Sequence, residues 1–290
     1  MDPRTRALLE ANLDDMLAAL GWRNVPILSR AARGLARPAA LRFAREMTAF
    51  DDEVERSGIA SAAGSLLAGF IRDVRVRGAR HIPARGPCLL LSNHPGMTDT
   101  LVLLSSIPRR DLLVLAAERP FLAALQAAGR SLILLPDARE RRMAAMRRAV
   151  SHLRSGGSLL TFPAGRIEPD PAVLPGAEEA IQRWSDSSIA FLRLAPGCVA
   201  VPLVVSGVLE PRAQESPIVH LLRRTAAGRE QLAVMLQVLV HTRSPSRWRT
   251  RACLDVLPAI PGRDLLARGE GANAALIREV AGFLRSRGRA

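Results

Sequence analysis

The chain has 290 residues, enough to bury one large core or two smaller ones. A hydrophobic fraction of 48% and a charged fraction of 23% are ordinary for a globular protein and exclude a chain that is disordered throughout. The formal net charge of +14 favours polyanionic partners, a class that includes nucleic acid, anionic lipid headgroups and acidic carrier proteins.

The placement of the cysteines and the length of the apolar segments indicate in which cellular compartment the protein is expected. Cys88, Cys198 and Cys253 are odd in number, far apart and set in apolar surroundings, which predicts buried free thiols in a reducing compartment. The N-terminus lacks the basic start and apolar core of a secretory signal. The longest apolar candidate, from Ile59 to Ile71, is shorter than the ~18–20 residues of a spanning helix. We therefore expect a cytoplasmic protein that is at most peripheral at a membrane.

The first 72 residues predict helices. Apolar residues recur at helical spacing up to a glycine that ends the pattern: Leu8, Leu9, Leu13, Met16, Leu17, Leu20 and Gly21. Pro26 and Pro38 predict breaks that leave short pieces after this helix. A third helical stretch is expected from Leu41 through Ile71, with an interruption near Gly58. Residues 1–72 are therefore expected to form a helical N-terminal region.

Strand patterns begin at Val74. Val74 and Val76 alternate with arginines, which predicts a strand with one wet face. The apolar run Cys88–Leu91, closed by a polar turn, predicts a strand buried on both faces. Four more short apolar runs predict further strands: Leu112–Leu115, Leu132–Leu135, Ser158–Phe162 and Val199–Val205. Because helical segments lie between several of them, we expect an α/β fold over residues 73–290, with a mixed, mostly parallel central sheet flanked by helices.

Two of the helices in this region have recognisable boundaries. The segment Arg139–Arg154 is covered by arginines and stopped by Gly156-Gly157, and its predicted apolar stripe is Met143, Met146, Val150 and Leu153. Near the C-terminus, Asn273 is expected to cap an amphipathic helix whose apolar residues are Leu276, Ile277, Val280, Phe283 and Leu284.

The loop after Cys88–Leu91 carries the residues best suited to chemistry. His94 lies in a turn that should leave its ring accessible, at the end of a sheet strand where α/β proteins place their sites. Asp99 follows at the start of a predicted helix. A carboxylate on one imidazole nitrogen fixes the tautomer and leaves the other nitrogen as a base, which can deprotonate a hydroxyl that attacks an acyl thioester. The alternative is that Asp99 only caps the helix and His94 only fills the turn.

The sequence around this pair resembles the first signature block of the glycerol-phosphate and lysophospholipid acyltransferases. That block reads N-H-x-x-x-x-D after an apolar strand introduced by Gly-Pro, and here it is Asn93-His94-Pro95-Gly96-Met97-Thr98-Asp99. The third and fourth blocks are similar to Phe162-Pro163-Ala164-Gly165-Arg166 and to the strand containing Val201-Pro202. The second block is the poorest match, within Gly129–Asp137, and its arginine is assigned first to Arg139 and second to Arg130.

The resemblance spans roughly residues 72 to 260 and implies an O-acyltransferase of phospholipid biosynthesis. It implies an acyl-CoA or acyl-carrier-protein donor, a lysophospholipid or related lipid acceptor, and no cofactor or metal. The N-terminal helices would dock the enzyme peripherally on the inner face of the cell membrane. His94 would be the general base oriented by Asp99, with substrate bound by Asn93, Gly96, Arg139, Phe162, Pro163, Gly165, Arg166 and Pro202.

Departures from the family pattern leave the acceptor open. Ala164 stands where the family usually has glutamate, so an amino-acid-containing lyso-lipid or a glycolipid precursor is an alternative acceptor. Glu168 and Asp170 could replace that glutamate or lie solvated in a proline-rich loop. Arg166 fits a phosphate, since a guanidinium forks onto phosphate oxygens, but it could equally be a surface arginine.

Other classes of function have weaker support. The remaining histidines, His81, His152, His220 and His241, lack a second ligand at metal spacing and are expected to be structural or surface residues. The basic stretch around Trp248 could touch headgroups or form a solvated loop. A non-catalytic lipid or nucleic-acid binder stays open as an alternative, although no nucleic-acid recognition motif is present and aromatic residues make up only 3% of the chain.

Overall fold

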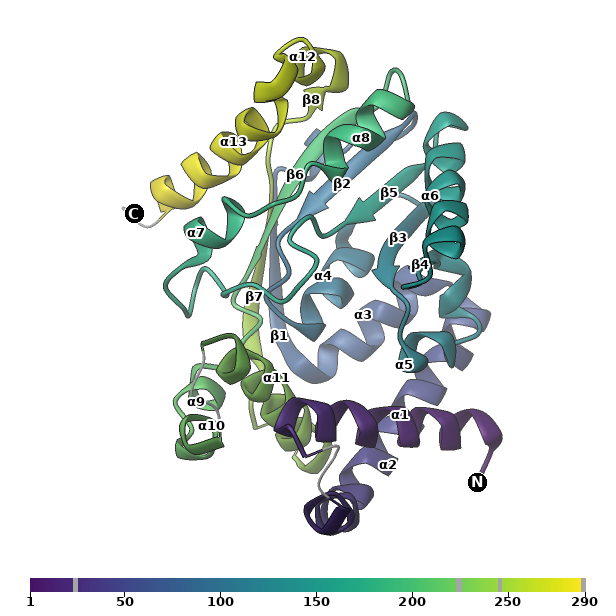
Figure 1. Ribbon diagram of the computed structural model, residues 1–290, viewed down its shortest axis with the longest axis vertical. Helices are drawn as coiled ribbons and strands as arrows, with labels where there is room; N and C mark the ends of the chain where they lie inside the picture. Colours follow the sequence, from purple (N-terminus) through teal and green to yellow (C-terminus); the bar gives the residue numbers. More distant parts are fainter. Residues whose placement is uncertain (23–25, 223–225, 245–246, 288–290) are drawn as a thin grey trace.

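A single eight-stranded sheet lies at the centre of the computed structural model, which describes residues 1–22, 26–222, 226–244 and 247–287 (Figure 1). The strand order is β1-β7-β6-β2-β5-β3-β4, and β8 pairs with β6. Pairing is parallel except where β6 meets β7 and β8. The strands are β1 (Ile71–Arg77), β2 (Cys88–Ser92), β3 (Leu112–Ala117), β4 (Leu132–Leu135), β5 (Ser158–Thr161), β6 (Val199–Ser206), β7 (Thr250–Val256) and β8 (Ile260–Pro261).

Helices precede the sheet and cover both of its faces, which confirms the predicted mixed, mostly parallel α/β fold with an N-terminal helical region. The first three are α1 (Pro3–Leu20), α2 (Pro26–Ser57) and α3 (Ile59–Phe70). The later ones are α4 (Met97–Ser106), α5 (Pro120–Ala123), α6 (Arg139–Arg154), α7 (Ala177–Ile181), α8 (Ser187–Leu194), α9 (Pro211–Gln214), α10 (Pro217–Leu222), α11 (Ala226–Arg243), α12 (Gly262–Leu266) and α13 (Ala272–Arg287), with short 3-10 turns at Ala79–His81, Ala128–Ser131 and Gly269–Gly271.

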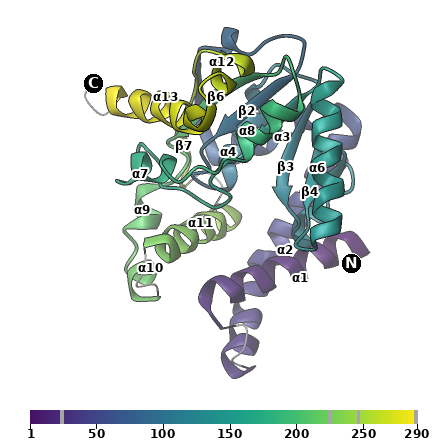
Figure 2. The ribbon, with the colours of Figure 1, turned by 45° about the horizontal axis from the view of Figure 1, so that its top comes forward.

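The two faces of the sheet pack against different helices. Along β2, Leu90 joins a core cluster with residues of α1 to α4, whereas Leu89 and Leu91 join a second cluster with residues of α6, α8 and α13. Figures 1 and 2 show α3 and α4 on one side of the sheet and α6, α8 and α13 on the other. Successive side chains of a strand point to opposite faces, so a strand covered on both faces requires the continuous apolar run that the sequence has here.

The six predicted strands are present, but other expectations were wrong. Helix α2 continues through Pro38, because packing against α1 along its length outweighs the one backbone hydrogen bond that a proline removes. Asn273 lies inside α13 and donates to the Trp184 carbonyl oxygen at 3.0 Å, so it does not cap the helix. Met143 is 52% exposed and lies outside the buried stripe of α6. Strands β7 and β8 were missed because Arg251 and Asp255 interrupt the apolar pattern of β7 and β8 has only two residues.

The cysteines are free, as predicted. Cys88 and Cys198 are buried and Cys253 is half-buried. Burial raises the pKa of the Cys88 thiol to about 12 and that of Cys198 to about 11, so both thiols stay protonated near neutral pH. Within the part of the chain that the structure describes, no helix combines the length and hydropathy needed to cross a bilayer.

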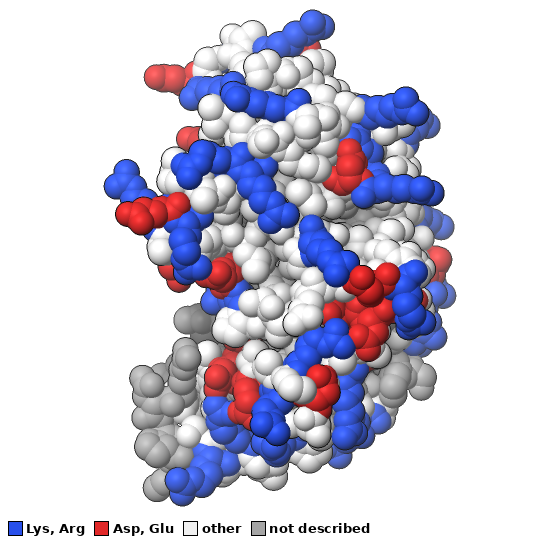
Figure 3. Space-filling view, turned by 90° about the vertical axis from the view of Figure 1, so that its right-hand side faces the viewer, with Lys and Arg blue, Asp and Glu red and all other residues white. Residues whose placement is uncertain are grey.

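Arginines are not gathered into one patch on the side of the molecule where α6 lies. The view onto this side shows basic side chains in separate groups with acidic ones between several of them (Figure 3). Ion pairs join Arg141 to Glu118 at 3.1 Å and Arg142 to Asp137 at 3.4 Å. All four side chains are exposed, so each pair contributes about 1 kcal/mol or less to stability.

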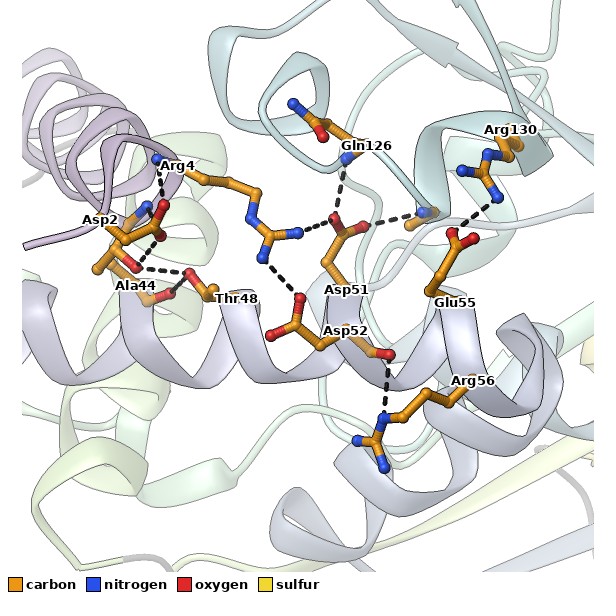
Figure 4. Close-up of polar contacts among 12 residues, drawn as sticks. Asp2, Arg4, Ala44, Thr48, Asp51, Asp52, Glu55, Arg56, Gln126 and Arg130 are labelled. Atoms are coloured by element: carbon orange, nitrogen blue, oxygen red, sulfur yellow. Dashed lines mark hydrogen bonds and ion pairs between the residues drawn. The ribbon is translucent and has the colours of Figure 1, made fainter.

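The N-terminal helices share a core with the sheet and are fastened to it by a buried carboxylate. Leu8, Leu9 and Phe43 belong to the same cluster as Leu90 of β2. Asp51 of α2, which is fully buried, accepts hydrogen bonds from the backbone N–H groups of Gln126 and Ala128 at 3.0 and 2.9 Å (Figure 4). The Arg4 guanidinium of α1 donates to the same carboxylate at 3.1 Å. One side chain therefore joins α1, α2 and the segment that leads into β4.

We predict that Asp51→Ala lowers the free energy of unfolding by about 2–4 kcal/mol, because it leaves two buried N–H groups without an acceptor. Urea denaturation measures the change. The control is Asp52→Ala, since Asp52 pairs with the same arginine at 2.6 Å but is 51% exposed, and its loss should cost about 1 kcal/mol or less. Equal effects of the two substitutions would contradict the assignment.

Candidate active site

The candidate site is the loop between β2 and α4, at the carboxyl end of a strand in the middle of the sheet. β2 lies between β5 and β6, so the loops that follow all three strands meet at this edge. Gly96 precedes the first residue of α4, and Asp99 lies in the first turn of that helix. The Gly96 N–H donates to Asp99 Oδ2 at 3.0 Å. This bond closes the turn and fixes the carboxylate next to the loop.

His94 and Asp99 lie in direct contact. His94 Nδ1 and Asp99 Oδ2 are 2.7 Å apart, and Thr100 Oγ1 donates to Asp99 Oδ1 at 3.0 Å. The Asp99 side chain is fully buried, whereas 28% of the His94 side chain is exposed. With Nδ1 directed at the carboxylate, the imidazole is held in the tautomer that keeps a lone pair on Nε2.

Opposing influences act on the pKa of His94. Burial alone would lower it, but the charge of Asp99, its hydrogen bond, and the charge of Glu168 together raise the pKa above its ordinary value. The Phe162 ring lies against the imidazole, with centroids 4.5 Å apart and planes inclined at 31°. The pair therefore forms a basic, partly enclosed imidazole with one nitrogen open to a substrate.

Two residues expected to bind substrate have structural contacts instead. Asn93 is 2% exposed, and its amide donates to the Val205 carbonyl oxygen at 2.8 Å and accepts from the Val205 N–H at 2.7 Å, which ties the loop to β6. Pro202 is buried in the middle of β6 and accepts from the Leu257 N–H. It lies between the residues of β6 that pair with β8 and those that pair with β7. A proline has no N–H, and at this position no hydrogen bond to β7 or β8 is lost because of it.

The loop after β5 brings several predicted residues to the site. Pro163 is buried, whereas Gly165 and Arg166 are exposed. Gly165 has φ +63°, in the left-handed region that favours glycine. Among the described contacts, the Arg166 guanidinium makes no hydrogen bond or ion pair. Glu168 and Asp170, which the sequence allowed to be solvated, are 2% and 0% exposed. Sequence reasoning missed their contacts because both carboxylates bind loops that are distant in the sequence.

The arginines of the second block lie farther from β2. Arg139 is the exposed first residue of α6, directly after β4. β4 is three positions from β2 in the sheet, which corresponds to roughly 14 Å across the strands. Arg130, the second candidate, pairs with Glu55 of α2 at 2.7 Å. Of the three arginines Arg130, Arg139 and Arg166, Arg166 is the one that follows a strand next to β2.

A small apolar pocket lies beside the loop that carries His94. It is lined by residues 95–98 of the loop, Phe70 at the end of α3, Val208 and Leu209 after β6, and Val234 of α11, with their neighbours. The pocket admits hardly more than a water molecule. Trp248, expected in a solvated basic patch, is instead partly buried against Leu209 and its neighbours.

Three of the remaining histidines have structural contacts, in agreement with the prediction. His81 Nδ1 lies 2.9 Å from the Val256 carbonyl oxygen, and His152 Nε2 lies 2.8 Å from that of Asp111. His241 is buried, pairs with Glu46 at 3.1 Å and stacks on a phenylalanine ring. His220 is exposed in α10. Within the described ranges, no group of three or more histidine, cysteine or acidic side chains is placed to hold a metal ion.

The part of the chain that contains these residues is similar to a known protein family. Residues 73–206 match the family model described as Acyltransferase. This segment is an acyltransferase-family domain. The match confirms the family resemblance seen in the sequence motifs, and it runs from β1 to the last residue of β6, so it includes His94, Asp99 and Arg166.

Two further comparisons cover the whole chain. A comparison with curated proteins gives no match. One similar solved structure is the crystal structure of the 1-acyl-sn-glycerophosphate (LPA) acyltransferase PlsC from Thermotoga maritima. The two chains are 16% identical, the similarity covers 97% of this chain and 98% of that chain, and the TM-score is 0.44.

We predict that Asp99→Asn lowers the pKa of His94, because the substitution removes the nearest negative charge while it keeps the size of the side chain. A pH titration of the His94 imidazole signals by NMR measures the shift. Asp73→Asn, at an exposed position on β1, is the control and should leave the titration unchanged. A folded Asp99→Asn protein with the original His94 titration would refute the coupling of the two side chains.

Proposed function

We propose that the chain transfers a fatty acyl group from acyl-CoA or acyl-carrier protein to a hydroxyl of a lysophospholipid or a related lipid. The proposal depends chiefly on the 2.7 Å contact between His94 Nδ1 and Asp99 Oδ2 inside an acyltransferase-family domain. His94 acts as the general base, and Asp99 orients it. The net charge of +14 suits an anionic lipid surface, where the N-terminal helices of residues 1–72 would dock the enzyme.

The reaction needs no enzyme nucleophile. Neutral His94 takes the acceptor's hydroxyl proton at Nε2 while the hydroxyl oxygen forms a bond to the thioester carbonyl carbon. Asp99 stabilises the imidazolium that results, because its carboxylate lies on the opposite ring nitrogen. The tetrahedral intermediate then breaks its C–S bond, and the leaving thiolate takes the proton back from Nε2. The products are an ester and a free thiol.

Arg166 is the best candidate to bind a phosphate of the acceptor or donor. It is exposed, it follows a glycine, and it belongs to the same loop as Phe162, whose ring contacts His94. A guanidinium binds phosphate through paired N–H groups, and here no described acidic side chain competes for them. Arg139 is a weaker candidate because its strand lies at the far end of the order β2-β5-β3-β4.

A non-glycerophosphate acceptor is favoured by one specific observation. Ala164 is half-buried against the core cluster that contains Leu89 and Leu91, and no carboxylate is present at that position. Ala164 therefore offers an acceptor no charge and no hydrogen-bonding side chain at this point of the loop. A panel of lyso-lipids, including amino-acid-containing lipids and glycolipid precursors, distinguishes the acceptors when the products are read by mass spectrometry.

We predict that His94→Ala lowers acyl transfer by about 10²–10⁴-fold, because it removes the base. Thiol release from an acyl thioester in the presence of the lyso-lipid panel measures the rate, and circular dichroism checks the fold. His220→Ala is the matched control at an exposed histidine and should retain full activity. Full activity in a folded His94→Ala protein would overturn the proposed function, whereas salt-sensitive vesicle binding by a wild-type protein that consumes no thioester would indicate a lipid binder.

We predict that Arg166→Gln raises the KM for a phosphate-bearing acceptor roughly tenfold or more, because it removes a charge-assisted, bidentate contact. A neutral acceptor should show an unchanged KM. Arg139→Gln, assayed in parallel, should have little effect on either acceptor. A larger increase in KM for Arg139→Gln than for Arg166→Gln would transfer the phosphate site to α6.

A further inference from the structure

The segment between β5 and α7, residues 162–176, crosses the ends of two neighbouring strands, and we name it the strap. Its Glu168 pairs with the main chain of His94 in both directions. The Glu168 N–H donates to the His94 carbonyl oxygen at 2.8 Å, and the His94 N–H donates to Glu168 Oε2 at 3.0 Å. The backbone on which the imidazole is mounted is therefore fixed from the loop that follows the adjacent strand.

A second carboxylate of the strap fastens the next loop. Asp170 Oδ1 accepts from the Gly207 N–H at 2.8 Å, and Oδ2 accepts from the N–H groups of Val208 and Leu209 at 2.8 and 2.9 Å. These three residues directly follow β6, which flanks β2 on the side opposite β5. The strap thus spans from β5 across β2 to β6, with one acidic residue for each loop it reaches.

The Glu168 carboxylate is fully engaged by the protein. Its side chain is 2% exposed, and Oε1 accepts from the Trp184 indole N–H at 3.0 Å. The Trp184 carbonyl oxygen in turn accepts from the Asn273 amide of α13 at 3.0 Å. A buried carboxylate is costly unless its oxygens have donors, and here each oxygen has one.

We propose that Glu168 is a positioning residue for His94, which holds the main chain of the base in place and supplies a negative charge close to its ring. The proposal rests on the proposed function, in which His94 is the base. Asp99 fixes the orientation of the imidazole from one ring nitrogen, and Glu168 fixes the peptide from which the side chain extends. The two carboxylates come from different loops and act on different parts of the same residue.

Charge couples Glu168 to the imidazole as well. Burial raises the pKa of Glu168 to about 7, against the lowering influence of its hydrogen bonds to Trp184 and His94 and of the His94 charge. The charge of Glu168 is among the causes that raise the pKa of His94. His94 and Asp99 are the charged groups that act on Glu168 among the described residues. Glu168 and His94 therefore influence each other's titration.

The deciding experiment compares Glu168→Gln with the wild type. In the folded variant, the NMR titration of His94 should shift to lower pH, because a nearby negative charge is lost. The acidic limb of kcat/KM should shift in the same direction, and kcat should fall roughly tenfold or more with little change in the acceptor KM, because the base is displaced and not the acceptor. A purely structural role would lower the melting temperature without moving the His94 titration.

Asp170→Asn is the matched control, since it removes the charge of the other strap carboxylate, and it should leave the His94 titration unchanged. Should Glu168→Gln fail to fold, Trp184→Phe removes the indole donor and keeps an aromatic ring in the core, although a smaller one. It should also move the His94 titration downward, because Glu168 then ionises at higher pH. A wild-type His94 titration and kcat in either folded Glu168 or Trp184 variant overturns the proposal. The titration needs no substrate, so it tests the role of Glu168 even if the protein shows no acyl transfer.

Discussion

The site depends on one constraint, which is that the Asp99 carboxylate is buried without access to water and must be paired by the protein. Its donors are the Gly96 N–H, the Thr100 hydroxyl and the His94 imidazole, all within the same short loop and helix turn. A carboxylate in the first turn of a helix is also favoured by the partial positive charge of the helix N-terminus. The requirement fixes the spacing of five residues between the two side chains and explains why the imidazole is oriented before any substrate binds.

Buried carboxylates fasten other segments of the chain by accepting hydrogen bonds from backbone N–H groups. Asp51 accepts main-chain N–H groups before β4, Glu168 accepts that of His94, and Asp170 accepts three after β6. Each of these carboxylates accepts backbone N–H groups of another segment, so these bonds are insensitive to most side-chain substitutions at the residues they hold. At the edge of the sheet that carries the site, Glu168 and Asp170 fix the loops that follow β2 and β6.

The sequence predicts the parts of this arrangement that depend on local pattern. The apolar runs locate the six strands because strands covered on both faces must be continuously apolar, and the spacing of His94 and Asp99 predicts their contact because the residues are near neighbours in the chain. The contact of Glu168 with His94 joins residues in different loops, and no periodicity signals it. Pro202 stays a predicted site residue from its motif, and the structure adds that it lies in β6 between the residues that pair with β8 and those that pair with β7.

The candidate site divides into a buried part and an exposed part, and the division has a consequence for specificity. The base is built from buried groups, so substitutions there disturb the pKa of His94 and the fold together. Gly165 and Arg166 are exposed and hold no other loop among the described contacts, while Glu168, two residues beyond Arg166, anchors the strap. Glu168 therefore holds the strap in place between the exposed residues Gly165 and Arg166 and the part of the strap that follows. In the proposed reaction, a substitution at Gly165 or Arg166 can therefore change the contacts to the acceptor while the proton transfer at His94 stays the same.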